Sequence, residues 1–129
     1  MMIEKYVKEA KKENWDLIDS DMPKIVKDPD NVRWAYQKAL DDTDENVRDL
    51  GASILEKGKI PRGQLEKVKQ HLFEKMMTDS NPYVRYRCAF ALINHSTGEY
   101  NSELKKVIAE AKLDPDVADQ AQEYEKKLH

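Results

Sequence analysis

Two segments of this chain are versions of one short motif: Asp42-Thr-Asp-Glu-Asn-Val-Arg48 and Asp79-Ser-Asn-Pro-Tyr-Val-Arg85. Each is an acidic turn with a helix-capping Asp or Asn three residues before a valine, and Val-Arg then opens an apolar helix. Val47 and Val84 lie 37 residues apart (84 − 47 = 37), and a shorter copy, Asp114-Pro-Asp-Val117, follows 33 residues later (117 − 84 = 33). A period of this length is typical of stacked helical hairpins.

Apolar residues recur at helical spacing before and after the first copy of the motif. One stripe is Val32, Ala35, Tyr36, Ala39 and Leu40, and the next is Val47, Leu50, Gly51, Ile54 and Leu55. Both follow the i, i+3, i+4, i+7, i+8 pattern of one buried helical face. The helix expected at about 82–94 is apolar on nearly all sides, which predicts a place at the centre of the fold. Since no segment has the pattern of a strand, we expect an all-α fold.

The motif divides the chain into the parts of a single domain over residues 1–129. We expect N-terminal capping helices in 1–28, a first repeat in 29–59, a second repeat in 60–96 and a degenerate C-terminal repeat in 97–129. Near the N-terminus, Pro23 predicts a break near Ser20 rather than one continuous helix. Near the C-terminus, Ser102 is the expected cap of one helix and Asp114-Pro115 the expected start of another.

Composition excludes several classes of protein. The 129 residues include only four Gly and five Pro, which favours helix over sheet. The net charge of −3, from 25 acids against 22 bases, lacks the concentrated positive charge of a nucleic-acid binder. One cysteine cannot form an internal disulfide, so a reducing compartment is expected. The first residues do not resemble a signal peptide, and the longest apolar run, Cys88–Ile93, is far shorter than the ~20 residues that span a bilayer. These features predict a cytoplasmic protein without a membrane segment.

The spacing of the motif resembles the HEAT-like repeats of the phycobilin-lyase type. In that pattern Val-Arg is followed by small residues four and five positions after the valine and by Leu eight positions after it, here Val47, Arg48, Gly51, Ala52 and Leu55, and again Val84, Arg85, Cys88, Ala89 and Leu92. The third copy departs from the pattern, because Ala118 replaces the Arg, and Tyr124, seven rather than eight positions after Val117, takes the place of the Leu. The resemblance implies a short right-handed α–α superhelix, armadillo-like, of about three hairpins plus N-terminal helices. It implies no single function, because the family includes scaffolds, chromophore lyases and DNA-repair glycosylases.

Four residues are candidates for contacts with a partner: Arg48, Arg85, Tyr86 and Arg87. The two equivalent arginines either bind the acidic turns, with Asp44 and Asp79 as available acceptors, or form an anion site on the inner surface. Tyr86 and Arg87 are either packing residues or an exposed aromatic–arginine pair of the kind that anchors interfaces. Trp34, in the first repeat, is likewise either a core residue or a surface anchor.

Catalytic and metal-binding patterns are absent from the sequence. His71 and His95 are 24 residues apart (95 − 71 = 24), and neither has a Cys or His at ligand spacing. Cys88 lies on the buried stripe, which favours a small core residue over a nucleophile. No Gly-rich phosphate loop or Gly-x-Ser-x-Gly turn occurs. We therefore expect no metal, no cofactor and no catalytic residue.

These observations favour a non-catalytic scaffold that displays a concave helical surface to another protein. The alternative is a HEAT-like enzyme or enzyme subunit, either chromophore-lyase-like or DNA-repair-glycosylase-like. Five arginines and a negative net charge argue against tight DNA binding. Monomer and homodimer stay open, because Trp15, Trp34 and Tyr86 could bury a self-interface.

Overall fold

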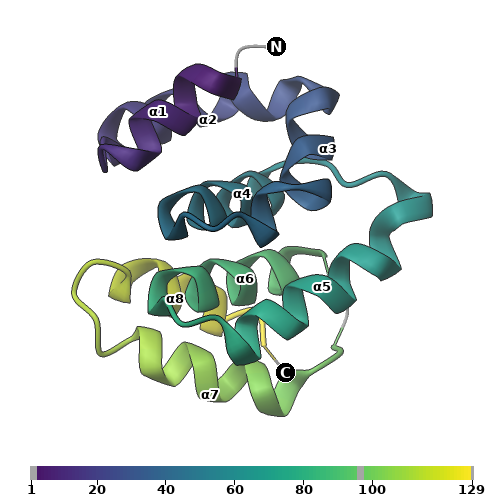
Figure 1. The fold of residues 1–129 in the computed structure, drawn as a ribbon. Helices are drawn as coiled ribbons and strands as arrows, with labels where there is room; N and C mark the ends of the chain where they lie inside the picture. The colour runs from purple at the N-terminus through teal and green to yellow at the C-terminus, as the bar shows by residue number, and fades with distance from the viewer. Residues whose placement is uncertain (1–2, 96–97, 129) are drawn as a thin grey trace.

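The computed structural model describes residues 3–95 and 98–128, so the expected boundary between residues 96 and 97 lies outside the described residues. In the described part the regular structure is entirely helical, with eight α-helices and two short 3₁₀ helices, which confirms the predicted all-α class (Figure 1). The helices are α1 (Ile3–Lys11), α2 (Trp15–Lys27), α3 (Pro29–Gln37), η1 (Ala39–Asp41), α4 (Glu45–Lys57), η2 (Arg62–Gln64), α5 (Leu65–Thr78), α6 (Pro82–His95), α7 (Asn101–Ala111) and α8 (Ala118–Glu125). None of these helices combines the length and apolar character needed to cross a bilayer.

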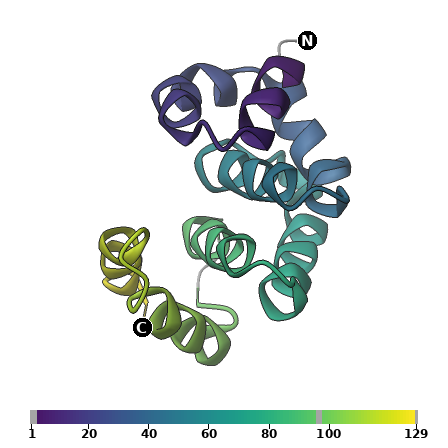
Figure 2. The ribbon, with the colours of Figure 1, turned by 60° about the vertical axis from the view of Figure 1, so that its left-hand side comes forward.

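Consecutive helices pack in pairs, α1 with α2, α3 with α4, α5 with α6 and α7 with α8 (Figures 1 and 2). The second helices of these pairs also contact one another in order, α2 with α4, α4 with α6 and α6 with α8. Figure 2 shows that α5 and α8 lie on opposite sides of α6. In the described part, α1 also packs on α4 and α7 also packs on α6, so α4 and α6 have neighbours on several sides.

The acidic turns form the same local structure in all three copies of the motif. The first Asp of each turn accepts a hydrogen bond from the backbone N–H two residues later: Asp42 from Asp44 at 2.8 Å, Asp79 from Asn81 at 2.9 Å, and Asp114 from Asp116 at 2.9 Å. A side chain that accepts a backbone N–H in this way stabilises a turn, which competes with continuation of the helix. The turn is thus the best preserved part of the motif.

Helix capping confirms the prediction for the first two copies and contradicts it for the third. Asp44 accepts the N–H of Asn46 at 2.8 Å, and Asn81 accepts the N–H of Tyr83 at 2.8 Å. In the third copy α8 begins only at Ala118, with Val117 at the N-cap and no side-chain cap. The prediction that Asp114-Pro115 starts a helix is wrong, because these residues form a turn that ends before the helix begins.

The core lies around α6, as its composition predicts. Val84, Cys88, Ala89, Phe90, Ala91 and Leu92 are fully buried. Gly51 on α4 is needed for close packing, since a Cβ there would lie 2.5 Å from Cβ of Ala39. Gly58 ends α4, and its N–H donates to the carbonyl of Ile54 at 2.7 Å. The small residues of the motif therefore allow neighbouring elements to approach closely.

Two local predictions near the ends of the chain are wrong. Residues 15–27 form one helix, α2, with Pro23 inside it and no break near Ser20. Proline removes one backbone bond, but burial of Ile18, Met22 and Ile25 on one face of α2 offsets that loss. Ser102 does not cap α7, because the helix begins at Asn101 after Tyr100, which has a left-handed backbone with φ 63°.

Candidate functional site

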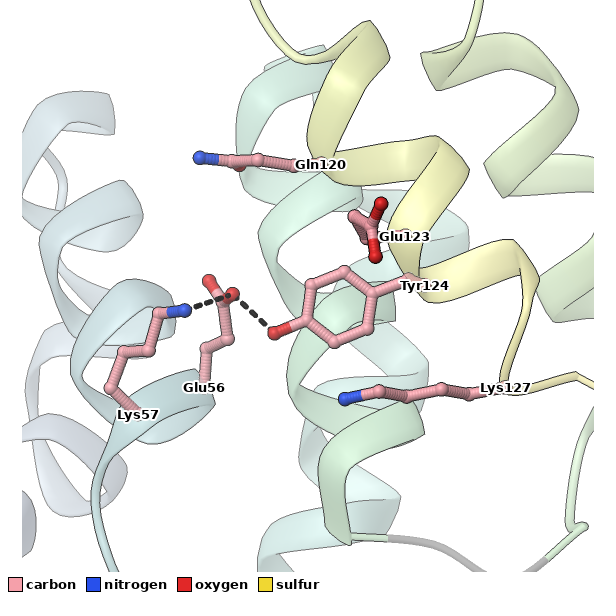
Figure 3. A pocket seen from close by; sticks show the side chains of 6 residues that line it. All are labelled: Glu56, Lys57, Gln120, Glu123, Tyr124 and Lys127. Carbon is pink, nitrogen blue, oxygen red and sulfur yellow. Dashed lines mark hydrogen bonds and ion pairs between the residues drawn. The ribbon is translucent and has the colours of Figure 1, made fainter.

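A pocket of about 280 Å³ opens between α4 and α8, beside α6 (Figure 3). Its lining comes from the C-terminal end of α4 and from α8 with the turn after it: Glu56, Lys57, Gln120, Glu123, Tyr124 and Lys127. We call this the α4–α8 pocket. It joins residues more than sixty positions apart in the sequence, so it depends on how the pairs of helices stack.

Glu56 is the buried charged residue of the pocket, with a side chain only 3 % exposed. Its Oε2 accepts a hydrogen bond from the Tyr124 hydroxyl at 2.5 Å and lies 3.4 Å from Nζ of Lys57, as the dashed lines in Figure 3 mark. The Lys57 side chain is 55 % exposed. A carboxylate removed from water needs strong partners, and here the closest is a neutral hydroxyl.

Tyr124 holds the pocket together. Its ring stacks on Phe90 of α6, with centroids 4.7 Å apart and planes 10° apart. Its hydroxyl also accepts a hydrogen bond from Nδ2 of Asn94 at 2.9 Å, and the same Nδ2 donates to the backbone carbonyl of Glu56 at 2.9 Å. Burial and then the nearby Glu56 raise the pKa of Tyr124, so the hydroxyl stays protonated at neutral pH and donates to Glu56.

Lys127 lines one side of the pocket and contacts Asn94 and the Tyr124 ring. Its Nζ donates to Oδ1 of Asn94 at 3.2 Å and lies 5.0 Å from the centroid of the Tyr124 ring. Glu123, from the same helix end, is exposed and pairs with Lys126 at 3.2 Å. The pocket thus has a buried acid at its base and exposed charged side chains around it.

A second polar cluster continues from the pocket along α4 and α6. Nε of Arg87 lies 3.5 Å from Oδ1 of Asp49, and Nη1 of Arg87 donates to Oε1 of Gln120, a pocket residue. Ser53 donates to the same Asp49 oxygen at 3.5 Å. Burial raises the pKa of Asp49 to about 6, although Arg87 acts in the opposite direction. Arg87 therefore connects a buried acid to the rim of the pocket.

The predicted residues Arg48 and Arg85 both bind acidic turns. Nε and Nη2 of Arg48 donate to the two Asp79 carboxylate oxygens at 2.9 and 3.2 Å, and Nη1 donates to the carbonyl of Asp42 at 3.0 Å. Nη1 of Arg85 donates to the carbonyl of Asp79 at 3.0 Å, and Nη2 donates to Oε1 of Glu110 at 3.0 Å. These contacts match the structural interpretation of the two arginines, with Asp79 as the acceptor; Asp44 instead caps its own helix.

The remaining two predicted residues differ from each other. Tyr86 is 5 % exposed, packs edge-on against Tyr83 and donates from its hydroxyl to Glu110 at 3.5 Å. Arg87 contacts the pocket residue Gln120. Of the four predicted residues, Arg87 is thus the one that the structure brings to the pocket; partner binding by any of them stays a prediction.

Sequence analysis missed most of the pocket. Asp49, Ser53 and Glu56 recur at positions i, i+4 and i+7 of α4, which places three polar side chains on one face of a helix. That stripe was visible in the sequence as a polar face, but such a face is usually solvated. Tyr124, one position before the place of the motif Leu in the third copy, was the stronger signal, because a buried tyrosine hydroxyl requires a polar partner.

The other candidates from the sequence lie apart. Cys88 is buried at the centre of α6, and burial raises its pKa, so its thiol stays protonated. Nε2 of His71 lies 2.9 Å from Oδ1 of Asp41, and Nε2 of His95 lies 2.7 Å from the carbonyl of Leu55. Within residues 3–95 and 98–128, no group of three or more His, Cys, Asp or Glu side chains could hold a metal ion.

Comparison of the chain with protein-family models, with curated proteins and with solved structures found no significant match. The geometry of the α4–α8 pocket is therefore the basis for a functional proposal.

Proposed function

We propose that this protein is a non-catalytic protein-interaction module, a short HEAT-like right-handed superhelix whose second helices carry a concave binding surface. In this proposal α2, α4, α6 and α8 are the inner helices, and a segment of another protein binds across α4, α6 and α8 at the α4–α8 pocket. Repeat proteins of this type bind partners along extended concave surfaces formed by stacked helices.

The equivalent bonds of the two motif arginines support the repeat interpretation. Arg48 donates to the carbonyl of Asp42 and Arg85 donates to the carbonyl of Asp79, each six residues back in the chain and each at 3.0 Å. The turns preceding them have the same side-chain hydrogen bond and the same type of cap. Two segments that repeat both sequence and hydrogen bonding are more simply explained as structural repeats than as a coincidence of composition.

The buried carboxylate of Glu56 at the base of an open pocket is the observation that carries the binding proposal. Residues with most influence on binding are commonly fixed, desolvated groups surrounded by a polar rim. Glu56 is held by Tyr124, which is itself fixed between Phe90 and Asn94. The rim is supplied by exposed side chains such as Lys57 and Glu123. A rigid base with an adaptable rim suits the recognition of a protein segment.

Site-specific photo-cross-linking tests this proposal. A benzophenone amino acid at Glu123, on the pocket rim, should cross-link a discrete partner in cells that express the protein at its natural level. The matched control places the same amino acid at Lys67, an exposed residue of α5, on the other side of α6 from α8 (Figure 2).

A cross-linked product at Glu123 that is absent at Lys67, and whose mass requires a second protein, supports the proposal. Equal products at both positions, or none at either, contradict it. A product between two copies of this chain also contradicts it, because the pocket would then be a self-interface.

A further inference from the structure

We infer that the α4–α8 pocket binds one basic side chain, an arginine or a lysine of the partner segment, with Glu56 as its counter-ion and Lys57 as a built-in competitor. This inference rests on the proposed function, since the segment that carries the side chain belongs to the partner. It specifies the chemistry of recognition, which the helical surface alone does not.

The size of the pocket fits a single side chain. Its volume is about 280 Å³, at or below the lower limit of the ~300–1,000 Å³ typical of small-molecule pockets. Metal-ligand clusters are not found in the described part of the chain. A long side chain that enters with its charged end first fills this space more readily than a cofactor-sized molecule.

The charge at the base of the pocket selects a cation. An ionised carboxylate can accept about four hydrogen bonds, and the close donor to Glu56 is the Tyr124 hydroxyl at 2.5 Å. Nζ of Lys57 is 3.4 Å away, longer than the ~2.7–2.9 Å of a good charge-assisted hydrogen bond. An arginine or lysine that enters the pocket can therefore bind Glu56 better than Lys57 does.

The balance of charges in the pocket makes Lys57 the residue that competes with an entering cation for Glu56. The pocket is lined by two acids, Glu56 and Glu123, and by two bases, Lys57 and Lys127. Lys127 is held by Asn94, so Lys57 is the basic residue next to the buried carboxylate. When a basic side chain enters, Lys57 can move into water, and Glu56 exchanges one cation for another. An anion would instead have to lie against a buried carboxylate, which is unfavourable.

Peptide probes with a neutral control test the selectivity for a cation. The probes are the blocked pentapeptide acetyl-Gly-Gly-Arg-Gly-Gly-amide, its lysine counterpart, its glutamate counterpart, and a form with citrulline, which has the shape of arginine without the charge. Binding is followed on ¹⁵N-labelled full-length protein through the side-chain amides of Asn94 and Gln120 and the backbone amides near Glu56 and Tyr124.

The arginine or lysine probe should shift these signals in a saturable way, with a dissociation constant on the order of millimolar for one side chain. The citrulline probe should bind at least about tenfold more weakly, and the glutamate probe should leave the signals unchanged. Equal binding of the arginine and citrulline probes, or binding of the glutamate probe at these residues, overturns the inference.

Two variants locate the interaction. Glu56→Gln should weaken the basic probe at least about tenfold, and Lys57→Met should strengthen it several-fold because the internal competitor is gone. Lys67→Met on α5 removes a lysine of the same kind away from the pocket and should have no effect. If Glu56→Gln perturbs the fold, Lys57→Met still tests the inference. Unchanged or weaker binding of the basic probe to that variant overturns the role of Lys57 as a competitor.

The outcome is separable from that of the proposed function. A partner cross-linked at Glu123 whose binding is unaffected by Glu56→Gln supports the interaction module and overturns the basic-side-chain inference. Binding of the basic probe without any cross-linked protein supports the chemistry of the pocket and contradicts a protein partner.

Discussion

Arg48 and Arg85 occupy equivalent positions of one motif, yet the ion pair of Arg48 is more buried than the ion pair of Arg85. Each donates to the backbone carbonyl of the first Asp in its own turn. Beyond that, Arg48 makes a two-bond contact with Asp79, and these side chains are 13 % and 2 % exposed. Arg85 instead makes one bond to Glu110, and these side chains are 23 % and 50 % exposed. The first junction is buried and the second is open to water.

The difference shows how one copy of the motif depends on the copy that follows it. Asp79 forms the turn of the second copy and also accepts from the arginine of the first copy, so one residue fixes two units. The corresponding Asp114 of the third copy does not receive Arg85, which pairs with Glu110 on α7. In the third copy Ala118 replaces the motif arginine. The motif thus locks α4 to the turn before α6, whereas α8 is attached through Tyr124 and its polar partners.

The largest expected effect comes from breaking the buried junction with Asp79→Ala. The substitution leaves the Arg48 guanidinium buried without its carboxylate and removes the acceptor for the Asn81 N–H. Loss of one partner of a buried ion pair typically costs about 3–5 kcal/mol. We expect the free energy of unfolding to fall by this amount, as measured by denaturant unfolding followed by circular dichroism at pH 7.

Asp114→Ala is the control at the corresponding position of the third copy. Asp114 forms the same turn bond and also interacts with the Tyr83 hydroxyl, but it does not receive a motif arginine, so its loss should cost only about 1–2 kcal/mol. Equal losses for the two variants would show that the turn bond alone accounts for the effect of Asp79 and that its pair with Arg48 adds no stability.

The second effect tests how α8 is attached. Tyr124→Phe keeps the ring on Phe90 but removes the hydroxyl that donates to Glu56 at 2.5 Å. A hydrogen bond to a charged group contributes about 1.5–3 kcal/mol, so unfolding should become easier by roughly that amount. Tyr36→Phe is the matched control, because the Tyr36 hydroxyl has no hydrogen bond within the described residues. If Tyr124→Phe left the free energy of unfolding unchanged, water would have replaced the hydroxyl at Glu56.

The parts of the fold that could be predicted from the sequence are those fixed by local chemistry. The turn bonds of Asp42 and Asp79, the caps Asp44 and Asn81, and the end of α4 at Gly58 depend on residues close together in the chain. The start of α8 was mispredicted, because Asp114-Pro115 has a cap-like sequence but its backbone continues as a turn until Val117.

The pocket could not be predicted in the same way. Glu56 and Tyr124 are 68 positions apart, and their contact depends on the angle at which the pair of helices α7 and α8 meets α6. The polar stripe of Asp49, Ser53 and Glu56 does not by itself indicate a pocket, because nothing local to α4 shows that α6 and α8 cover it. Arg87 was predicted as a contact residue from its own helix, and its neighbours Asp49 and Gln120 come from two others.

A third expected effect is that the stability of the protein depends on pH through Asp49, the buried acid next to Arg87. The native pKa of Asp49 is about 6, against an ordinary value of 3.8, because burial disfavours its charge. Arg87 on α6 lowers the pKa, whereas Asp19 on α2 raises it. The native state therefore holds the proton more tightly than the unfolded chain, so Asp49 makes the protein less stable as pH rises from about 4 to 6.

Asp49→Asn removes that dependence. Relative to the variant, the wild type should lose roughly 2 kcal/mol of unfolding free energy between pH 4.5 and pH 7.5. Denaturant unfolding at the two pH values measures the difference. The Asp49 carboxyl carbon, followed by NMR, should titrate near pH 6. A titration midpoint near 4 would show that water reaches Asp49 and that Arg87 outweighs burial.

The smallest effect is expected at the open junction. Glu110→Ala removes the carboxylate that pairs with Arg85, but both side chains are partly in water, so the cost should be about 0–1 kcal/mol and should shrink further as salt is added. A double-mutant cycle of Arg85→Met with Glu110→Ala should give a coupling energy well below that of Arg48→Met with Asp79→Ala in the same unfolding assay. Equal coupling energies would mean that the two junctions are equally strong and that exposure does not separate them. If the coupling at Arg85 is small, Arg85 can exchange Glu110 for a carboxylate of a partner at little cost. Arg48 cannot do so without opening the buried junction, so Arg85 is the arginine of the two that fits the predicted partner contact.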